Sequence, residues 1–266
     1  NSPDKLIHLF DKNTFEHLAS STYQGQGPGE ITIIGHVGID ETNRRFFVSD
    51  HGKLKIFAYD LDSVLTTPEY QPSVKIDMKK KLFPDDYLYL NDTLCIARII
   101  EPIGNNDYKP SVARWNMATG EINPMPYEYP DLKKVRFIYA ASAEHQLYVQ
   151  CYTQYDLMTI CDFNGNLKCN IYGPKWVNEK TQTQHYSLGV EFCGDKILAL
   201  YSGGDHRTDA YYPTKFLVFD LNGNYLKTLE TGYMITDFCY DKENNRLIIN
   251  LNDEIQFAYL DLEGII

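Results

Sequence analysis

The sequence lacks the long apolar run of a membrane-spanning protein. No stretch approaches the roughly eighteen apolar residues that a helix needs to cross a bilayer, and no signal peptide is visible. Residue 1 is Asn rather than Met, so an export signal or a lipid anchor would lie upstream of this chain. We therefore expect no transmembrane segment within the sequence itself.

Basic charge is also scarce. The chain has 25 Lys and Arg against 36 Asp and Glu, which gives a formal net charge of -11 and a pI near 5.1. The one basic run, Lys79 to Lys81, is typical of a solvated loop. Because binding to nucleic acid requires clustered Lys and Arg, the composition argues against nucleic acid and anionic membranes as partners.

Closely spaced metal ligands and catalytic signatures are missing as well. The six cysteines form no C-x-x-C pair, and the sequence contains neither H-E-x-x-H nor G-x-S-x-G. Four of the cysteines lie in apolar runs, where a thiol packs as a small hydrophobic group, so we expect free thiols, although the even count leaves disulfides open. The sequence predicts no catalytic residue, no metal ligand and no cofactor.

Helical periodicity is absent, whereas residues suited to β-sheets are abundant. No window carries a sustained apolar stripe of helical spacing, and the chain contains 21 Tyr and 13 Phe. With 266 residues the chain can bury a substantial core. The composition favours one large all-β domain over residues 1–266.

An internal repeat is visible when two segments are aligned. The segment DETNRRFFVSDHGKLKIFAYDLDS begins at Asp40, and DKENNRLIINLNDEIQFAYLDLEG begins at Asp241. They align without a gap and share Asp40 with Asp241, Asn43 with Asn244, Arg45 with Arg246, Asp60 with Asp261, and Leu61 with Leu262. Each segment reads as alternating strands and tight turns, so we expect the two copies to occupy equivalent strands of two blades.

Acidic or amide residues at the ends of third strands mark the repeating unit. The six landmarks are Asp11, Asp60, Asn116, Asp162, Asp220 and Asp261. Their spacing of about 50 residues, with four short strands in each unit, is typical of a propeller blade. The sequence predicts a six-bladed β-propeller with four-stranded antiparallel blades. Residues 6–10 and 15–19 would form the outer strands of a first blade that is incomplete at the N-terminus.

Within each later unit the pattern predicts an inner strand followed by a second strand. We expect inner strands at 37–40, 87–90, 137–140, 189–193 and 235–240, and second strands at 46–49, 94–98, 147–151, 197–201 and 247–251. No helix longer than about three turns is expected.

The stretch GQGPGEI, residues 25–31, suggests a phosphate-binding loop. A P-loop, however, requires G-x-x-x-x-G-K-[ST] before a helix, and the dinucleotide fingerprint requires G-x-G-x-x-G, whereas this stretch leads into a β-branched run. Glycine and proline instead supply the sharp turns of a chain that crosses from one blade to the next.

The loop and the segment VGIDETNRRFFVSDHGKLKIFAYDLD resemble six-bladed β-propellers of the NHL-like and TolB-like type. The resemblance is to a family abundant among exported proteins and lipoproteins of Bacteroides-like bacteria. It implies a location in the periplasm or cell envelope and a binding role, and it implies no catalytic residues.

In such a propeller the turns between second and third strands share one mouth with the loops that join the blades. Two of these turns are expanded, at 99–109 and 202–213. Arg98 and Arg207 are expected to be exposed, as are nearby tyrosines including Tyr155. The candidate ligand-binding residues of the mouth are Gln26, Glu30, Asp50, His51, Arg98, Glu101, Tyr152, His206, Arg207 and Asn252. Variable surface loops and solvated histidines are the alternative explanation for these residues.

Two functions fit these observations. The first is a non-enzymatic recognition module of the cell envelope that binds a peptide, a glycan or a partner protein at the mouth. The second is a metal-dependent hydrolase or lyase of the propeller lactonase kind. The inner strands offer few carboxylates for a metal, namely Asp40, Glu191 and Asp237, which favours the binding module.

Overall fold

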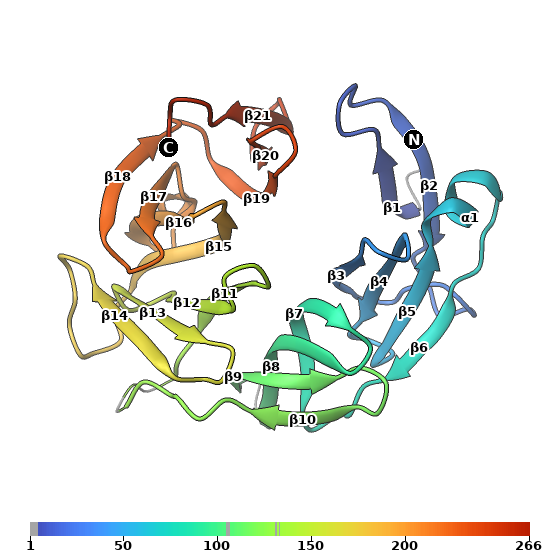
Figure 1. Ribbon diagram of the computed structural model, residues 1–266, viewed down its shortest axis with the longest axis horizontal. Coiled ribbons are helices and arrows are strands. Elements are labelled where there is room, and N and C mark those ends of the chain that lie inside the picture. Colours follow the sequence, from blue (N-terminus) through green and yellow to red (C-terminus); the bar gives the residue numbers. More distant parts are fainter. Residues whose placement is uncertain (1–4, 105–106, 131, 133) are drawn as a thin grey trace. The chain divides into compact units, whose positions relative to one another are not determined.

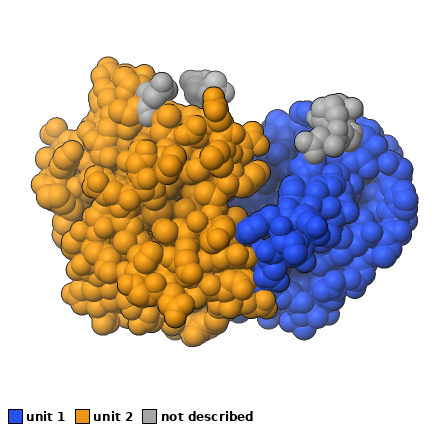
Figure 2. Space-filling view, turned by 90° about the horizontal axis from the view of Figure 1, so that it is seen from above, with its two compact units in different colours: residues 1–124 blue, residues 125–266 orange. Residues whose placement is uncertain are grey.

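The computed structural model describes residues 5–104, 107–130, 132 and 134–266. The chain divides into two compact units, residues 1–124 and 125–266, which Figure 2 colours separately. Strands dominate both units (Figure 1). Each unit is treated by itself below.

Unit 1 contains ten strands and a short helix within its described residues. They are β1 (Lys5–Phe10), β2 (His17–Tyr23), β3 (Ile34–Asp40), β4 (Arg45–Asp50), β5 (Lys55–Asp60), α1 (Leu61–Thr66), β6 (Ser73–Asp77), β7 (Phe83–Asn91), β8 (Leu94–Gly104), β9 (Asp107–Asn116) and β10 (Glu121–Pro124).

Unit 2 contains eleven strands and one 3-10 turn within its described residues. They are β11 (Phe137–Ser142), β12 (Leu147–Tyr152), β13 (Leu157–Asp162), β14 (Leu167–Tyr172), β15 (Thr183–Cys193), β16 (Lys196–Asp205), η1 (Asp209–Tyr211), β17 (Lys215–Asp220), β18 (Tyr225–Glu230), β19 (Ile235–Asp241), β20 (Arg246–Leu251) and β21 (Phe257–Asp261).

The strands form antiparallel sheets in sequence order, which is the arrangement of propeller blades. Four sheets have four strands: β3 to β6, β7 to β10, β11 to β14 and β15 to β18. A three-stranded sheet, β19 to β21, ends the chain, and the two-stranded sheet β1–β2 is the partial first blade. First strands of successive blades touch within each unit, β3 with β7, β11 with β15, and β15 with β19. The predicted all-β propeller with four-stranded antiparallel blades is confirmed.

The middle strands of the blades form the core because both of their faces are covered. All six residues of β12 are buried, as are the first five of β13. In β4 the last five residues are buried. A strand that is buried on both faces has no alternating polar pattern, which explains the continuous apolar runs in the sequence.

Several first strands begin earlier than the sequence pattern predicted. β3 begins at Ile34 rather than residue 37, β7 at Phe83 rather than 87, and β15 at Thr183 rather than 189. Each strand has a register shift near this end, between Ile34 and Val37, Pro84 and Asp86, and Gln184 and Tyr186. A bulge interrupts the period of two on which the prediction depended.

The first expanded turn is largely an extension of strands, and the second is so only in its first residues, 202–205. β8 and β9 continue to Gly104 and Asp107, so the insertion projects as a hairpin, and residues 105 and 106 of the predicted turn lie outside the described residues. β16 likewise continues to Asp205, opposite Thr183. Backbone pairing therefore orders much of what the sequence suggested was irregular.

Helix is as scarce as predicted. α1 has six residues, and the Asp60 side chain caps it by accepting a hydrogen bond from the Ser63 amide. Within the described part of the chain, no helix is long and apolar enough to cross a membrane. All six cysteines lie in this part and are free thiols, four of them buried.

The two aligned repeat segments form the same structure, as predicted. Asp40 is the last residue of β3. Its carboxylate accepts hydrogen bonds from Arg45, with 2.7 Å between Nη2 and Oδ2, and from the Asn43 side chain. Asp241 is the last residue of β19. Its carboxylate accepts hydrogen bonds from Arg246, with 3.0 Å between Nε and Oδ2, and from the Asn244 side chain. The shared residues of the repeat thus close equivalent turns between first and second strands.

We expect Asp40→Ala and Asp241→Ala each to lower the free energy of unfolding by about 1–3 kcal/mol, because each removes the acceptor for a buried turn network. Asp40 is 5% exposed and Asp241 8% exposed. Glu41→Ala, an exposed change in the same turn as Asp40, is the control and should stay within about 0.5 kcal/mol. Urea denaturation measures all three, and equal stabilities for the Asp40 and Glu41 variants would contradict the assignment.

Candidate functional site

The glycine-rich loop of unit 1 is held against the β4–β5 turn. Asp50, at the end of β4, is fully buried, and its carboxylate accepts hydrogen bonds from the backbone amides of Thr32, Ile33, Gly52 and Lys53. Although burial alone would raise the pKa of Asp50, these four amides hold it below its ordinary value. Asp50 therefore joins the two loops and does not face solvent, contrary to the expectation from the sequence.

Lys53 completes this junction. Its Nζ lies 2.8 Å from the carbonyl oxygens of Gly27 and Glu30. The Glu30 carboxylate turns back and accepts the Gly27 amide at 2.6 Å, while Gln26 stays exposed. The loop and the turn are thus brought to one face of unit 1, as the sequence predicted for that pair.

His51 is partly buried behind this junction. Its ring lies 5.8 Å from the ring of Phe83. A Cβ at Gly35 would lie 2.6 Å from His51 Nε2, so a larger residue there would require the His51 ring to move. The Nε2 atom is buried and has no hydrogen-bond partner among the described residues.

A cluster of ionisable side chains lies at the bulged ends of β3 and β7. We call His36, Asp85, Asp86 and Arg98 the inner-strand cluster. His36 Nδ1 lies 3.1 Å from Asp86 Oδ1, and Arg98 Nε lies 2.9 Å from Asp85 Oδ1. The four side chains are between 17% and 28% exposed, so the cluster is shielded but reaches solvent.

The inner-strand cluster contains two carboxylates, Asp85 and Asp86, and one arginine, Arg98, which attracts both. Arg98 neutralises Asp85 through two hydrogen bonds. Burial lowers the pKa of His36, which keeps the imidazole neutral, and burial raises the pKa of Asp86. Asp86 is therefore an acceptor whose ionised form a bound cation or strong hydrogen-bond donor would stabilise.

Arg98 is not the exposed residue that the sequence suggested. Its guanidinium is 21% exposed and is held by Asp85 because β7 bulges toward it. Glu101, on the projecting β8–β9 hairpin, is exposed as predicted. The hairpin also exposes Ile103 and Tyr108 beside it.

Unit 2 corrects two of the predicted mouth residues. Tyr152 is 2% exposed, and its ring packs edge-on against Phe137 with 5.9 Å between centroids. Tyr155 is also 2% exposed. These tyrosines fill space between strands, which is the usual fate of a large aromatic side chain in a stacked sheet.

His206, Arg207 and Asn252 are exposed as predicted. His206 Nδ1 lies 2.9 Å from the Gln182 carbonyl, which anchors the β16–β17 connection to the segment before β15. Arg207 pairs with Asp205, and this hydrogen bond holds the pKa of the Asp205 carboxyl well below its usual range. The backbone amide of Asn252 donates to the Met234 carbonyl at 2.8 Å. The Asn252 side chain is exposed in the β20–β21 turn.

A second ionisable group, missed from the sequence, lies fully buried in unit 2. His185 and Asp156 are each 1% exposed, with 3.7 Å between Nδ1 and Oδ1, and the Tyr201 hydroxyl donates to Asp156 at 3.3 Å. Burial lowers the pKa of His185 against the opposing pull of Asp156. The His185 Nε2 atom has no hydrogen-bond partner within the described chain.

The metal-dependent alternative requires several His, Cys, Asp or Glu side chains that converge on one ion. Across residues 5–104, 107–130, 132 and 134–266, no group of three or more His, Cys, Asp or Glu side chains could hold a metal ion. Asp40, one of the predicted inner-strand carboxylates, is engaged by Asn43 and Arg45.

A family model described as a 6-bladed beta-propeller, DUF5128, matches residues 4–92. No curated protein matches the chain. The matched segment ends in the turn between β7 and β8. It therefore includes the glycine-rich loop and most of the inner-strand cluster.

Solved structures resemble the chain over nearly its whole length. A member of the DUF4221 family from Bacteroides vulgatus is 13% identical, with 98% of this chain and 88% of that chain covered and a TM-score of 0.63. A protein of unknown function from Bacteroides caccae is 14% identical, with 99% and 88% covered and a TM-score of 0.55. At these identities the likeness shows the fold alone.

The extracellular domain of a candidate one-component system from B. thetaiotaomicron is also similar. It is 10% identical, with 96% of this chain but 31% of that chain covered, and the TM-score is 0.57. This chain therefore corresponds to one part of that longer protein.

The two arginines of the predicted mouth should respond differently to removal. We expect Arg98→Ala to lower the free energy of unfolding by about 3 kcal/mol, because it leaves a shielded carboxylate unpaired. Arg207→Ala removes an exposed pair and should stay within about 0.5 kcal/mol. Urea denaturation compares them directly, and equal effects would show that the inner-strand cluster is more hydrated than its burial indicates.

His185 should make stability depend on pH. Its folded-state pKa lies below the unfolded value of about 6.5, so the unfolded chain binds the extra proton first as pH falls. Stability is therefore fully present above about 6.5 and is lost as pH falls below it, by at most about 1.4 kcal/mol per pH unit for one proton. His185→Gln should have a shallower slope than the parent in urea denaturation between pH 6.5 and 5, and an unchanged slope would contradict this role.

Proposed function

We propose that the chain is a single propeller domain, spanning residues 1–266, that acts as a non-enzymatic recognition module of the cell envelope. The observation that carries the proposal is the inner-strand cluster, where two shielded carboxylates, Asp85 and Asp86, share one arginine at the end of unit 1 that also holds the glycine-rich loop. An acceptor kept ready in this way recognises a ligand by its charge or hydrogen bonds.

The chemistry of the cluster selects a ligand with a cationic or strongly donating group. Arg98 is already paired with Asp85, and the neutral His36 offers no positive charge to an anion. The projecting β8–β9 hairpin supplies an adjacent surface with Glu101 and an exposed Tyr108. A peptide with a lysine or arginine side chain fits this arrangement better than an acidic ligand does.

The exposed members of the predicted mouth stay candidate contacts, each within its own unit: two in unit 1 and three in unit 2. They are Gln26, Glu101, His206, Arg207 and Asn252. Asp50 and Tyr152 support the loops and strands that carry such contacts, because both are buried.

The envelope location and the NHL-like or TolB-like type are also part of the proposal, as is a lipid anchor upstream of Asn1. Support for the location comes from the structural similarity to an extracellular domain of a Bacteroides protein. A propeller exported by such a bacterium would meet peptides, glycans and partner proteins outside the cytoplasm.

Binding of three acetylated pentapeptides that differ only in a central Lys, Gln or Glu tests the ligand class. We expect the Lys peptide to bind tightest in fluorescence anisotropy, and Asp86→Asn to weaken it at least tenfold. Asp77→Asn, on the exposed side of β6, is the matched control and should bind as the parent does. Preference for the Glu peptide, or full binding by the Asp86 variant, would refute the proposal.

A further inference from the structure

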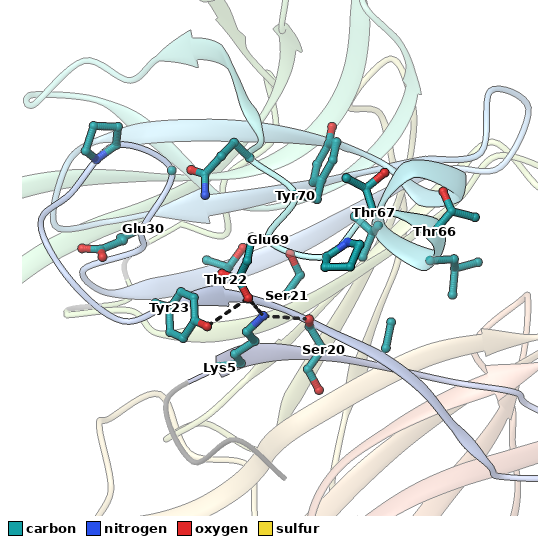
Figure 3. Close-up of a pocket in the computed structure, with 17 residues that line it drawn as sticks. Lys5, Ser20, Ser21, Thr22, Tyr23, Glu30, Thr66, Thr67, Glu69 and Tyr70 are labelled. Atoms are coloured by element: carbon teal, nitrogen blue, oxygen red, sulfur yellow. Dashed lines mark hydrogen bonds and ion pairs between the residues drawn. The ribbon is translucent and has the colours of Figure 1, made fainter.

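Unit 1 contains a pocket at its rim, open to solvent, whose lining includes no residue of the inner-strand cluster. This rim pocket has a volume of about 290 Å³ and lies between β2, the glycine-rich loop and the segment that follows α1. Figure 3 shows its lining side chains, which come from Lys5, residues 19–23, residues 28–30 and residues 64–71. Its size is near the lower end of ligand cavities, about 300 Å³, so it suits a small ligand.

The lining of the rim pocket is rich in hydroxyl groups and carries one lysine and two carboxylates. The hydroxyl-bearing residues are Ser20, Ser21, Thr22, Tyr23, Thr66, Thr67 and Tyr70. Glu69 is paired with Lys5 at 3.1 Å, and the Glu30 carboxylate accepts a hydrogen bond from the Gly27 amide at 2.6 Å, so each carboxylate already has a donor. Because each carboxylate already has a donor and most other polar groups are hydroxyls and amides, such a lining suits a neutral polar molecule that exchanges hydrogen bonds.

The two carboxylate oxygens of Glu69 differ in their contacts: one bonds to pocket side chains, and the other does not. Its Oε1 atom accepts from Lys5 Nζ at 3.1 Å and from the Tyr23 hydroxyl at 3.2 Å, as the dashed lines of Figure 3 show. No described residue bonds to Oε2, and none bonds to the Thr67 hydroxyl or the Gln71 amide. Together these groups offer donors and acceptors that a vicinal pair of hydroxyls can match.

The backbone around the rim pocket is strained at two positions. Thr22 and Glu69 have φ angles of 65° and 58°, in the left-handed region that β-branched and long side chains rarely adopt. Thr22 is fixed there by a 2.7 Å hydrogen bond between its hydroxyl and that of Tyr59. Such strain costs free energy and concentrates at ligand sites, where it fixes the direction of a side chain.

Gly29 closes the remaining wall. It has a φ of 73°, and a Cβ there would lie 2.4 Å from Gln71 Oε1. Glycine at this position therefore allows the segment after α1 to pack against the glycine-rich loop, so the loop forms part of the pocket wall as well as the crossing between blades.

We propose that the rim pocket binds a neutral hydroxylated ligand of the size of one sugar ring. The Thr67 hydroxyl, the Gln71 side-chain amide and the second Glu69 carboxylate oxygen exchange hydrogen bonds with ligand hydroxyls, and the charge of Glu69 strengthens those it accepts. The site is separate from the inner-strand cluster and does not depend on the function proposed for it.

Titration of the 15N-labelled protein by NMR with glucose, galactose, N-acetylglucosamine, glucosamine and glucuronate tests this site. At least one neutral sugar should saturate and shift the amide signals of Thr67, Glu69 and Glu30. Thr67→Val and Glu69→Gln should each weaken that sugar at least fivefold, whereas Glu121→Gln, on β10, should leave it unchanged.

Several results would overturn the proposal. They are no saturable binding by any neutral sugar, tighter binding of glucosamine or glucuronate than of every neutral sugar, or shifts confined to other parts of the chain. Equal affinities of the parent and the Thr67 and Glu69 variants would do the same. Asp86→Asn should not change sugar binding, so the failure of one site is distinguishable from the failure of the other.

Discussion

The constraint on which this structure depends is that the middle strands of each blade are covered on both faces. β12 and β13 have almost no exposed residue, and β4 is nearly as deeply buried. A strand in that position has no face on which to display a polar side chain without an unpaired group in the core. Chemistry is therefore confined to strand ends, turns and the loops between blades.

The first strands carry ionisable side chains because bulges interrupt their regular pairing near one end. The register shifts in β7 and β3 bring Asp85, Asp86 and His36 out of the regular pleat and toward Arg98. A similar shift in β15 lies beside His185. The difference between the two groups is shielding: the inner-strand cluster reaches solvent, whereas His185 and Asp156 are sealed. The first can meet a ligand, and the second can only couple stability to pH.

The glycine-rich loop connects the parts of unit 1 that carry these proposals. Its C-terminal end is fixed by Asp50 through the amides of Thr32 and Ile33, and Lys53 holds its carbonyl oxygens. Gly29 and Glu30 at the same time form a wall of the rim pocket. One short segment thus orients the end of β3 and shapes a cavity at the rim, which is why its glycines serve conformation rather than phosphate binding.

The sequence by itself determined the architecture, because the repeat from Asp40 and its copy from Asp241 carry the turn residues that close equivalent strand pairs. The apolar second strands, the scarcity of helix and the partial first blade followed from the same local patterns. Arg98, Asp50 and Tyr152 were selected by their place in a turn, but burial and pairing depend on neighbours distant in the sequence. His36 and Asp86 could not be found because a bulge hides strand ends from a period of two. Only the tertiary structure decided which polar groups reach solvent, because that depends on what packs against each strand.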